Sequence, residues 1–228
     1  GLAYFTGSKA HNIRLRERAI QFDLTLNEYG LFDKDDNLVA GEEEKDIYRA
    51  LDLPFIPPVL REDLGEIEAT TDDNFPELIK IEDIRGDLHM HTTWSDGALS
   101  TADMVEAAIA KGYDYVAITD HSKSLGVAGG LSEEELIQHT KEIAEIDARY
   151  GNFRVLAGTE VDIRKDGTLD YSDAILSKLD FVVASIHSGL RQDKETLTER
   201  IVCAMQNPHV RVIGHPTGRL IGDRDSYE

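Results

Sequence analysis

The stretch Gly86-Asp87-Leu88-His89-Met90-His91 decides how this chain of 228 residues is interpreted. It is predicted to be the end of a β-strand, and two of its residues are imidazoles spaced two positions apart. Side chains at i and i+2 project from the same face of a strand, so His89 and His91 can bind one ion. We therefore predict a metal site at the end of this strand.

Further candidate ligands follow at the ends of later apolar runs. Asp96 lies within Ser95-Asp96-Gly97, His121 lies within Thr119-Asp120-His121, and three more follow strand-like runs: Glu160, His187 and His215. A set that mixes imidazole with carboxylate suits zinc, manganese and iron better than calcium or magnesium alone. The joint pattern predicts a hydrolase site with several metal ions.

A lone His-x-His motif is a weak signal for metal binding. The remaining histidines, His11, His139 and His209, are interpreted as surface residues or as satisfied core residues. The stronger evidence is that the other five histidines follow successive strand-like runs, which alternate with helices along the chain. Trp94, the only tryptophan, is interpreted as packing near the site, with stacking on a nucleic-acid base as the alternative.

Composition limits the classes of protein to consider. A hydrophobic content of 41 % supports a sizeable core, arranged as one large α/β domain or as a small domain plus a medium one. The single cysteine, Cys203, excludes an internal disulfide framework and fits the reducing cytoplasm; we interpret its side chain as buried. We find no apolar run of membrane-spanning length and no leader sequence, so we expect a soluble cytoplasmic protein.

The formal net charge of −20 argues at first against binding to nucleic acid, because phosphate contacts depend on Lys and Arg. Bound divalent cations would reverse the local field around acidic ligands. The charge is also uneven, since residues 1–20 carry Lys9, Arg14, Arg16 and Arg18 against Glu17. One basic helix therefore opens an otherwise acidic chain.

Proline and polar residues between positions 54 and 80 are typical of a linker and divide the chain in two. Before it, Ser8 is predicted to cap a helix that packs through Ile13, Ala19 and Ile20. The elements predicted for this first unit are a helix over 8–21, a strand over 24–32, a turn over 33–37, a return strand at 38–39 and a helix over 42–51.

After the linker, strands alternate with helices. The predicted strands cover 84–88, 114–119, 153–158, 180–185 and 210–213. The predicted helices cover 100–111, 132–150, 171–178 and 194–206, and Ser132 with Glu135 forms a capping box. Every candidate ligand follows the carboxyl end of a strand, where β/α barrels and open α/β sheets collect their functional groups.

With these motifs assembled, the segment from about residue 80 to 228 resembles the PHP (polymerase and histidinol phosphatase) superfamily. The string Tyr4-Phe5-Thr6-Gly7-Ser8 resembles the motif that opens the thumb helix of family X DNA polymerases. Together they imply the bacterial family X arrangement: a thumb subdomain over 1–57, a linker over 58–80 and a PHP domain over 81–228. The implied fold is α/β, a truncated, distorted PHP-type β/α barrel preceded by a small α+β thumb.

The resemblance also implies how the ligands divide. The first ion is assigned His89, His91 and Glu160, the second is assigned Glu160, His187 and His215, and the third is assigned Asp96 with His121. Manganese is the preferred ion, with zinc or iron as alternatives. Asp120 is a candidate to orient a ligand or relay a proton, or else to cap a loop. Lys123 is a candidate phosphate contact.

In the thumb, Tyr4 and Phe5 resemble residues that pack against the sugar of an incoming nucleotide, while Gly7 frees the backbone to approach it. Asn12 and Arg16 fall where the family contacts the nascent base pair and the template. The alternative is that Tyr4 and Phe5 only cover the end of a small core.

The function implied is Mn²⁺-dependent hydrolysis at a DNA 3′ end, within a monomeric repair polymerase that uses gapped DNA and deoxynucleotides. The alternatives are a phosphatase of the histidinol phosphatase type and an inactive PHP module that braces a polymerase. The palm carboxylates with their Mg²⁺ and a final Asp-x-His motif are missing from this sequence. We therefore expect a piece of a longer protein, with no polymerase activity and weak or absent nuclease activity by itself.

Overall fold

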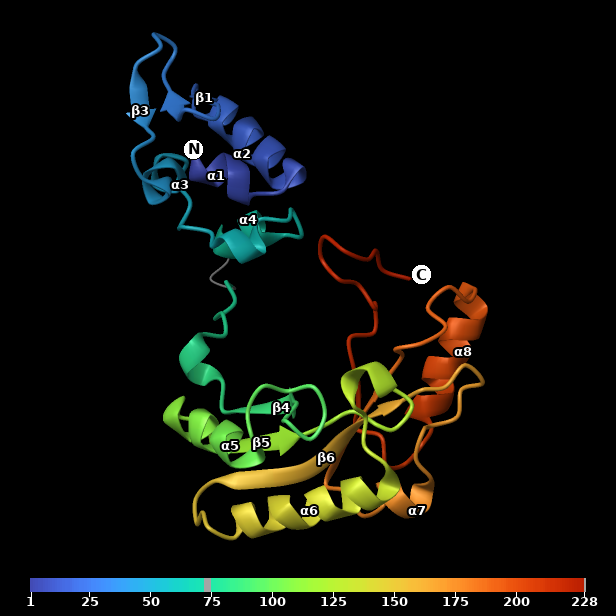
Figure 1. Ribbon diagram of the computed structural model, residues 1–228. Helices are drawn as coiled ribbons and strands as arrows, with labels where there is room; N and C mark the ends of the chain where they lie inside the picture. The colour runs from blue at the N-terminus through green and yellow to red at the C-terminus, as the bar shows by residue number, and fades with distance from the viewer. Residues whose placement is uncertain (72–74, 228) are drawn as a thin grey trace. The chain divides into compact units, whose positions relative to one another are not determined.

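The structure, a computed structural model, describes residues 1–71 and 75–227 and divides the chain into two compact units (Figure 1). Unit 1 is Gly1–Ile79 and unit 2 is Lys80–Glu228. Residues 72–74 of the predicted linker lie outside the described residues. Among the residues that are described, we find no helix with both the length and the apolar character needed to cross a membrane.

Unit 1 combines short helices with a small antiparallel sheet of strand order β1-β2-β3. Ser8 caps the longest helix by accepting a hydrogen bond from the backbone N–H of His11. The elements are α1 (Leu2–Thr6), α2 (Lys9–Gln21), β1 (Thr25–Leu26), β2 (Leu31–Phe32), β3 (Leu38–Ala40), α3 (Glu44–Ala50), the 3-10 turn η1 (Pro58–Leu60) and α4 (Glu66–Thr71).

The single strand predicted over 24–32 is wrong, because a turn divides it into β1 and β2. Asn27 makes this turn: its side-chain oxygen accepts from the backbone N–H of Tyr29, and its own N–H donates to the Gly30 carbonyl. Asn and Gly favour such a turn over continued extension. The local turn chemistry therefore outweighs the apolar alternation.

The packing face predicted for α2 is confirmed at Ala19 and wrong at Ile13 and Ile20. Ile13 and Ile20 are exposed, and the buried residues are His11, Leu15 and Ala19, spaced four apart along the helix. Residues four positions apart lie on one side of a helix, which is the usual pattern of its buried face. This face was missed because its first member is a histidine, whose burial depends on partners distant in the sequence.

Residues 58–71, predicted as part of the linker, instead pack into unit 1. Arg61 is fully buried and donates to the Ile56 carbonyl at 2.8 Å and to Glu44 Oε1 at 2.7 Å. Glu66 is buried as well and lies 2.5 Å from His11 Nδ1. Partners on other elements thus turn a segment with linker composition into part of the folded unit.

Unit 2 is built on a curled sheet of five parallel strands among its described residues, in the order β4-β5-β6-β7-β8 (Figure 1). The spatial order follows the chain order, as in a β/α barrel. The strands are β4 (Gly86–Met90), β5 (Tyr115–Ile118), β6 (Arg154–Asp162), β7 (Phe181–Ser185) and β8 (Val212–Ile213). This sheet confirms the predicted α/β class and is consistent with a PHP-type barrel.

Helices connect successive strands, and α6 runs along β6 in Figure 1. Its capping box forms as predicted, with Ser132 and Glu135 bonding each other's backbone N–H groups. The helical elements of unit 2 are the 3-10 turn η2 (Ile81–Asp83), α5 (Thr101–Ala110), the 3-10 turn η3 (Gly126–Ala128), α6 (Glu133–Asp147), α7 (Asp173–Leu176) and α8 (Lys194–Met205).

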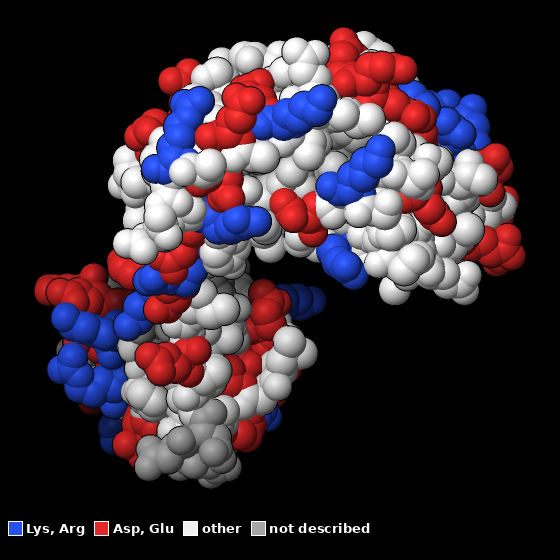
Figure 2. All heavy atoms as spheres, turned by 90° about the horizontal axis from the view of Figure 1, so that it is seen from below, with Lys and Arg blue, Asp and Glu red and all other residues white. Residues whose placement is uncertain are grey.

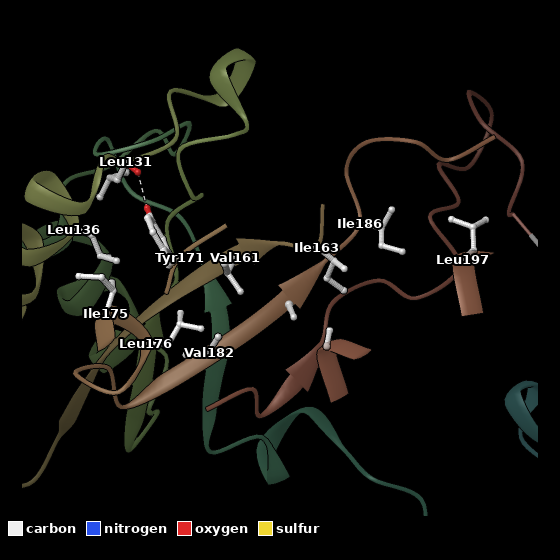
Figure 3. Close-up of a cluster of buried hydrophobic side chains, with 12 residues drawn as sticks. Leu131, Leu136, Val161, Ile163, Tyr171, Ile175, Leu176, Val182, Ile186 and Leu197 are labelled. Carbon is white, nitrogen blue, oxygen red and sulfur yellow. Dashed lines mark hydrogen bonds between the residues drawn. The ribbon is translucent and has the colours of Figure 1, made fainter. Parts of the chain in front are cut away.

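An apolar core supports the sheet (Figure 3). Val161 on β6 and Val182 on β7 belong to the same cluster as Ile175 and Leu176 of α7. The Tyr171 hydroxyl donates to the Leu131 carbonyl at 2.5 Å, so the ring is buried without an unpaired polar atom. Each fully buried aliphatic side chain contributes about 1.5–3 kcal/mol to folding.

Cys203 was predicted to be buried and is instead exposed. The inward face of α8 is formed by Leu197, Arg200 and Ala204. Position 203 points away from that face, since one residue along a helix turns the side chain by about 100°. The prediction was wrong because the buried face includes the charged residue Arg200.

Candidate metal centre

Glu160 lies at the centre of the candidate site, near the carboxyl end of the middle strand β6. Its side chain is only 1 % exposed. Glu160 Oε2 lies 3.2 Å from His89 Nε2, 3.4 Å from His91 Nε2 and 3.0 Å from His121 Nδ1. One carboxylate oxygen therefore faces three imidazoles that come from two neighbouring strand ends.

The other oxygen of Glu160 faces a second group. Oε1 lies 3.2 Å from His187 Nε2 and 2.9 Å from His215 Nε2, which follow β7 and β8. A carboxylate has two oxygens that can serve different ions, which an imidazole nitrogen cannot do. Glu160 is thus placed to lie between two cations.

Asp96 adds a third group on the outer side. Its Oδ1 lies 3.4 Å from His91 Nδ1, and its Oδ2 lies 3.5 Å from His121 Nε2. His121 therefore faces both Asp96 and Glu160, whereas the resemblance assigned it with Asp96 alone. All seven predicted metal ligands are brought together by the fold.

The spacing of these atoms fits divalent cations. Ligand atoms lie within 4.8 Å of one another in three sets: His89 with His91 and Glu160, His91 with Asp96 and His121, and His121 with Glu160 and His187. Two ligands of one ion with bonds of about 2.1 Å can be at most about 4.2 Å apart, so small side-chain movements suffice.

Unpaired nitrogen atoms support the same interpretation. His89 Nε2, His91 Nδ1 and His121 Nδ1 are buried and have no hydrogen-bond partner within the part of the chain that the structure describes. A buried polar atom without a partner costs about 1–3 kcal/mol. Cations would satisfy these nitrogens, so the residues present fit a metal centre.

Protonation of the site follows from its charges. Burial alone would raise the pKa of Glu160, but the surrounding imidazoles, His121 and His187 among them, lower it far below its usual range. Burial and the neighbouring His121 lower the pKa of His91. Glu160 is therefore ionised and His91 is neutral at pH 7, which are the forms that bind metals.

Two local features of the backbone make room for the cluster. Gly214 precedes His215, and a side-chain carbon at position 214 would collide with Ser185 Oγ and come within 3.4 Å of Glu160 Oε1. His215 itself has φ of +24°, an uncommon value for a residue other than glycine. Such conformations concentrate at functional sites.

Sequence analysis missed Asp162, which orients one of the imidazoles. Asp162 Oδ1 lies 2.5 Å from His187 Nδ1, so the opposite nitrogen of that ring faces Glu160. Burial alone would lower the pKa of His187, but the Asp162 and Glu160 carboxylates outweigh it and raise this pKa to about 9. The spacing Glu160-Val161-Asp162 was the available signal, since i and i+2 share one face of a strand.

Asp120 does not orient His121, as had been suggested. Its carboxylate accepts from Thr92 N and Thr92 Oγ1, each at 2.8 Å, and from Ser95 Oγ at 2.5 Å. It therefore holds the loop after β4, and not the loop after its own strand. Adjacent residues near a strand end point in opposite directions, so Asp120 and His121 face different surroundings.

Lys123 lies on the loop after β5, and its charge is already paired. Its Nζ is 2.9 Å from Glu133 Oε1 and 5.5 Å from the centre of the Tyr171 ring. A phosphate contact would therefore compete with an existing ion pair.

The predicted nucleotide-binding residues lie together where α1 meets α2 in unit 1. The Asn12 amide donates to the Tyr4 and Gly7 carbonyls, each at 3.0 Å, and the Arg16 guanidinium lies 5.7 Å from the centre of the Tyr4 ring. Phe5 is 77 % exposed, so the alternative that it only covers a core does not describe it. The motif forms an exposed surface in which Asn12 fixes the backbone.

Comparison with known proteins matches both units. Residues 1–62 match the family model of the DNA polymerase beta thumb, and residues 87–219 match that of the PHP domain.

The whole chain is 48 % identical over 232 residues to "DNA polymerase/3′-5′ exonuclease PolX" of Bacillus subtilis (strain 168), and it spans 40 % of that protein. A "Probable phosphatase" of Acetivibrio thermocellus is 36 % identical over 134 residues, which are 57 % of this chain and 53 % of that protein. The chain thus spans about half the length, or less, of these relatives.

Proposed function

The chain belongs to the family X DNA polymerases in which a polymerase thumb precedes a PHP domain, and from that premise we propose that its PHP domain hydrolyses phosphodiester bonds at DNA 3′ ends. The observation that carries the proposal is the buried Glu160 carboxylate, which lies within 3.4 Å of five imidazole nitrogens. The name of the Bacillus subtilis relative supports DNA as the substrate and the 3′ end as the point of attack.

We assign the ligands in three groups. His89, His91 and Glu160 hold one cation, Glu160 with His187 and His215 holds a second, and Asp96 with His121 holds a third. Mn²⁺ is the ion proposed, because a mixed set of imidazoles and carboxylates suits borderline ions; Zn²⁺ and Fe²⁺ have similar preferences.

Bound divalent cations would supply Lewis acidity for the phosphoryl oxygens and a nucleophilic water at neutral pH. The protein's own contribution is to hold the donor atoms in place. Glu160 keeps its negative charge between two groups of imidazoles, and Asp162 fixes the ring of His187 so that Nε2 faces the site. Since all seven candidate ligands lie in this one chain, no second copy is needed to bring them together, and we propose a monomer.

We propose that the thumb residues Tyr4, Phe5, Gly7, Asn12 and Arg16 contact gapped DNA and a deoxynucleotide in the intact protein, together with Mg²⁺-binding palm carboxylates. The acidic composition and the mixture of red and blue on the face in Figure 2 support weak, salt-sensitive binding of DNA by this chain. We place the protein in the cytoplasm, where a DNA repair enzyme of bacteria meets its substrate.

A phosphatase is the second candidate, because the Acetivibrio thermocellus relative carries that name. The test gives the intact protein and its Glu160→Ala variant a labelled primer-template and, in parallel, histidinol phosphate, each with Mn²⁺. Shortening of the primer from its 3′ end by the wild type alone supports the exonuclease. Turnover of histidinol phosphate alone supports the phosphatase, and no turnover of either substrate with any divalent cation supports a bracing module.

A further inference from the structure

The loop that carries Asp96 is short and tightly folded. The backbone N–H groups of Ser95 and Gly97 both donate to the Thr92 carbonyl, at 3.1 and 2.8 Å. A side-chain carbon at Gly97 would lie 2.5 Å from the carbonyl carbon of His91. The loop from Thr92 to Gly97 therefore folds back against His91.

Among the described residues, the Asp96 carboxylate contacts only the two imidazoles and Ser95 Oγ of its own loop, at 3.5 Å. Its side chain is 48 % exposed, and its oxygens lie 3.4 and 3.5 Å from nitrogens of His91 and His121. An exposed carboxylate at these distances is free to change rotamer. Its position then depends on what fixes the loop.

Two attachments fix the loop. In the first, Asp120 accepts from Thr92 and Ser95 as described above. In the second, the Trp94 ring stacks on His139 of α6, with ring centres 4.7 Å apart and an angle of 19° between the planes. The Trp94 indole N–H also donates to Glu142 Oε2 at 2.9 Å, one turn further along α6.

The surface under Trp94 is buried. His139 is 1 % exposed, and its Nε2 lies 3.1 Å from Thr101 Oγ1 at the start of α5. Burial lowers the pKa of His139, so the ring is neutral and offers a flat surface for stacking. Trp94 thus connects the Asp96 loop to the meeting point of α5 and α6.

We propose that Trp94 is a positioning residue for Asp96: its stack on His139 and its hydrogen bond to Glu142 hold the loop so that Asp96 completes the cation site with His121. The inference rests on the proposed metal centre and assigns Trp94 a role inside the protein. It differs from the base-stacking role considered from the sequence.

The test measures Mn²⁺ binding to the 228-residue chain from the electron paramagnetic resonance signal of free Mn²⁺. Trp94→Ala is expected to weaken one Mn²⁺ site about 10-fold, the lower end of losses when a residue supporting a metal ligand is removed. Glu142→Ala removes only the acceptor of the indole and is expected to weaken that site about threefold, as for one hydrogen bond. Trp94→Phe keeps an aromatic ring over His139, so this conservative variant is expected to bind Mn²⁺ more tightly than Trp94→Ala does.

Two controls separate this role from a general loss of structure. Glu134→Ala removes an exposed carboxylate from the same helix and should leave Mn²⁺ binding unchanged. The emission of Trp94, the only tryptophan, should shift to longer wavelength in Glu142→Ala as the indole becomes more exposed. Circular dichroism monitors the fold of each variant.

Asp96→Asn distinguishes failure of the inference from failure of the proposed function. If Asp96→Asn loses one Mn²⁺ while Trp94→Ala and Glu142→Ala bind as the wild type does, Trp94 does not position Asp96. If Asp96→Asn also binds as the wild type does, the cation site itself is wrong. Should Trp94→Ala unfold, an unchanged isotherm for Glu142→Ala overturns the inference.

Discussion

Both units bury histidines against a glutamate, but the two arrangements differ in whether their polar atoms are satisfied. In unit 1, His11 lies between Glu66 Oε1 at 2.5 Å and the Tyr48 hydroxyl at 3.0 Å, so both ring nitrogens have partners. In unit 2, the imidazoles around Glu160 leave buried nitrogens without hydrogen bonds among the described residues. The first arrangement is complete within the chain, whereas the second leaves nitrogen atoms that bound cations would satisfy.

The sharpest way to break this comparison is to remove Glu160. Because Glu160→Ala deletes a ligand of two proposed cations, metal-dependent hydrolysis by the intact protein is expected to fall about 10³-fold, the upper end of losses for one transition-state contact. Primer shortening with Mn²⁺ measures this. Activity within tenfold of the wild type would contradict the assignment of Glu160 as the shared ligand.

Removing the glutamate of unit 1 should lower the stability of the fold instead of metal-dependent activity. Glu66→Ala leaves His11 without its carboxylate partner. It also removes the acceptor of the hydrogen bonds that the backbone N–H groups of Asp63 and Leu64 donate to Glu66, at 2.8 Å each. Unit 1 is expected to lose about 3 kcal/mol of stability, as for a buried pair that loses one partner. Urea unfolding measures it, with the exposed Glu62→Ala as the matched control. Equal stability of the two variants would show that the network does not support the fold.

Asp162→Ala tests a residue that acts through a ligand. With the orienting carboxylate gone, His187 can rotate, and Mn²⁺ affinity is expected to fall about 10-fold. Asp166→Ala, an exposed residue four positions later in the sequence, is the control. Mn²⁺ titration followed by calorimetry distinguishes them, and equal affinity for both variants would remove Asp162 from the site.

The stability of unit 1 should also depend on pH, with a smaller effect than the substitutions above. Burial alone would raise the pKa of Glu66, but the hydrogen bonds from His11 and from backbone N–H groups outweigh it and lower the pKa below the ordinary value of 4.5. The stability from ionised Glu66 is therefore present above pH 4.5 and lost as pH falls through the lowered pKa. Thermal unfolding from pH 6 to pH 3 should show a steeper loss for wild type than for Glu66→Gln. The same loss of stability with falling pH in both proteins would show that ionised Glu66 does not stabilise unit 1.

Lys123 should have the smallest effect. Its ion pair with Glu133 joins two partly exposed side chains, and such pairs contribute about 0–1 kcal/mol. Lys123→Ala is therefore expected to change the rate of primer shortening less than about threefold. A loss of 100-fold would instead show that Lys123 leaves Glu133 and contacts the substrate.

The same contrast explains what the sequence allowed us to predict. His89, His91, Glu160, His187 and His215 could be predicted because parallel strands end on one side of a sheet, so position in the chain indicates position in space. His121 and Asp96 followed the same rule. The placement needed no knowledge of individual contacts.

Residues whose role depends on one distant partner could not be predicted in this way. Arg61 and Glu66 have the composition of a solvated linker, and only their contacts with Glu44 and His11 show that they are buried. Similarly, the role of Asp120 depends on Thr92, which follows a different strand and donates a hydrogen bond to its carboxylate. Local pattern carries no information about such partners.

The chain order of the sheet has a consequence for synthesis on the ribosome. Since each strand from β5 to β8 pairs with the strand made just before it, the sheet can grow one strand at a time as the polypeptide emerges. His89 and His91 are translated first, and His215 arrives more than a hundred residues later. Tight binding of the cation proposed for the group that includes His215 must therefore wait until β8 has docked, which would make it a marker for the end of assembly of this sheet.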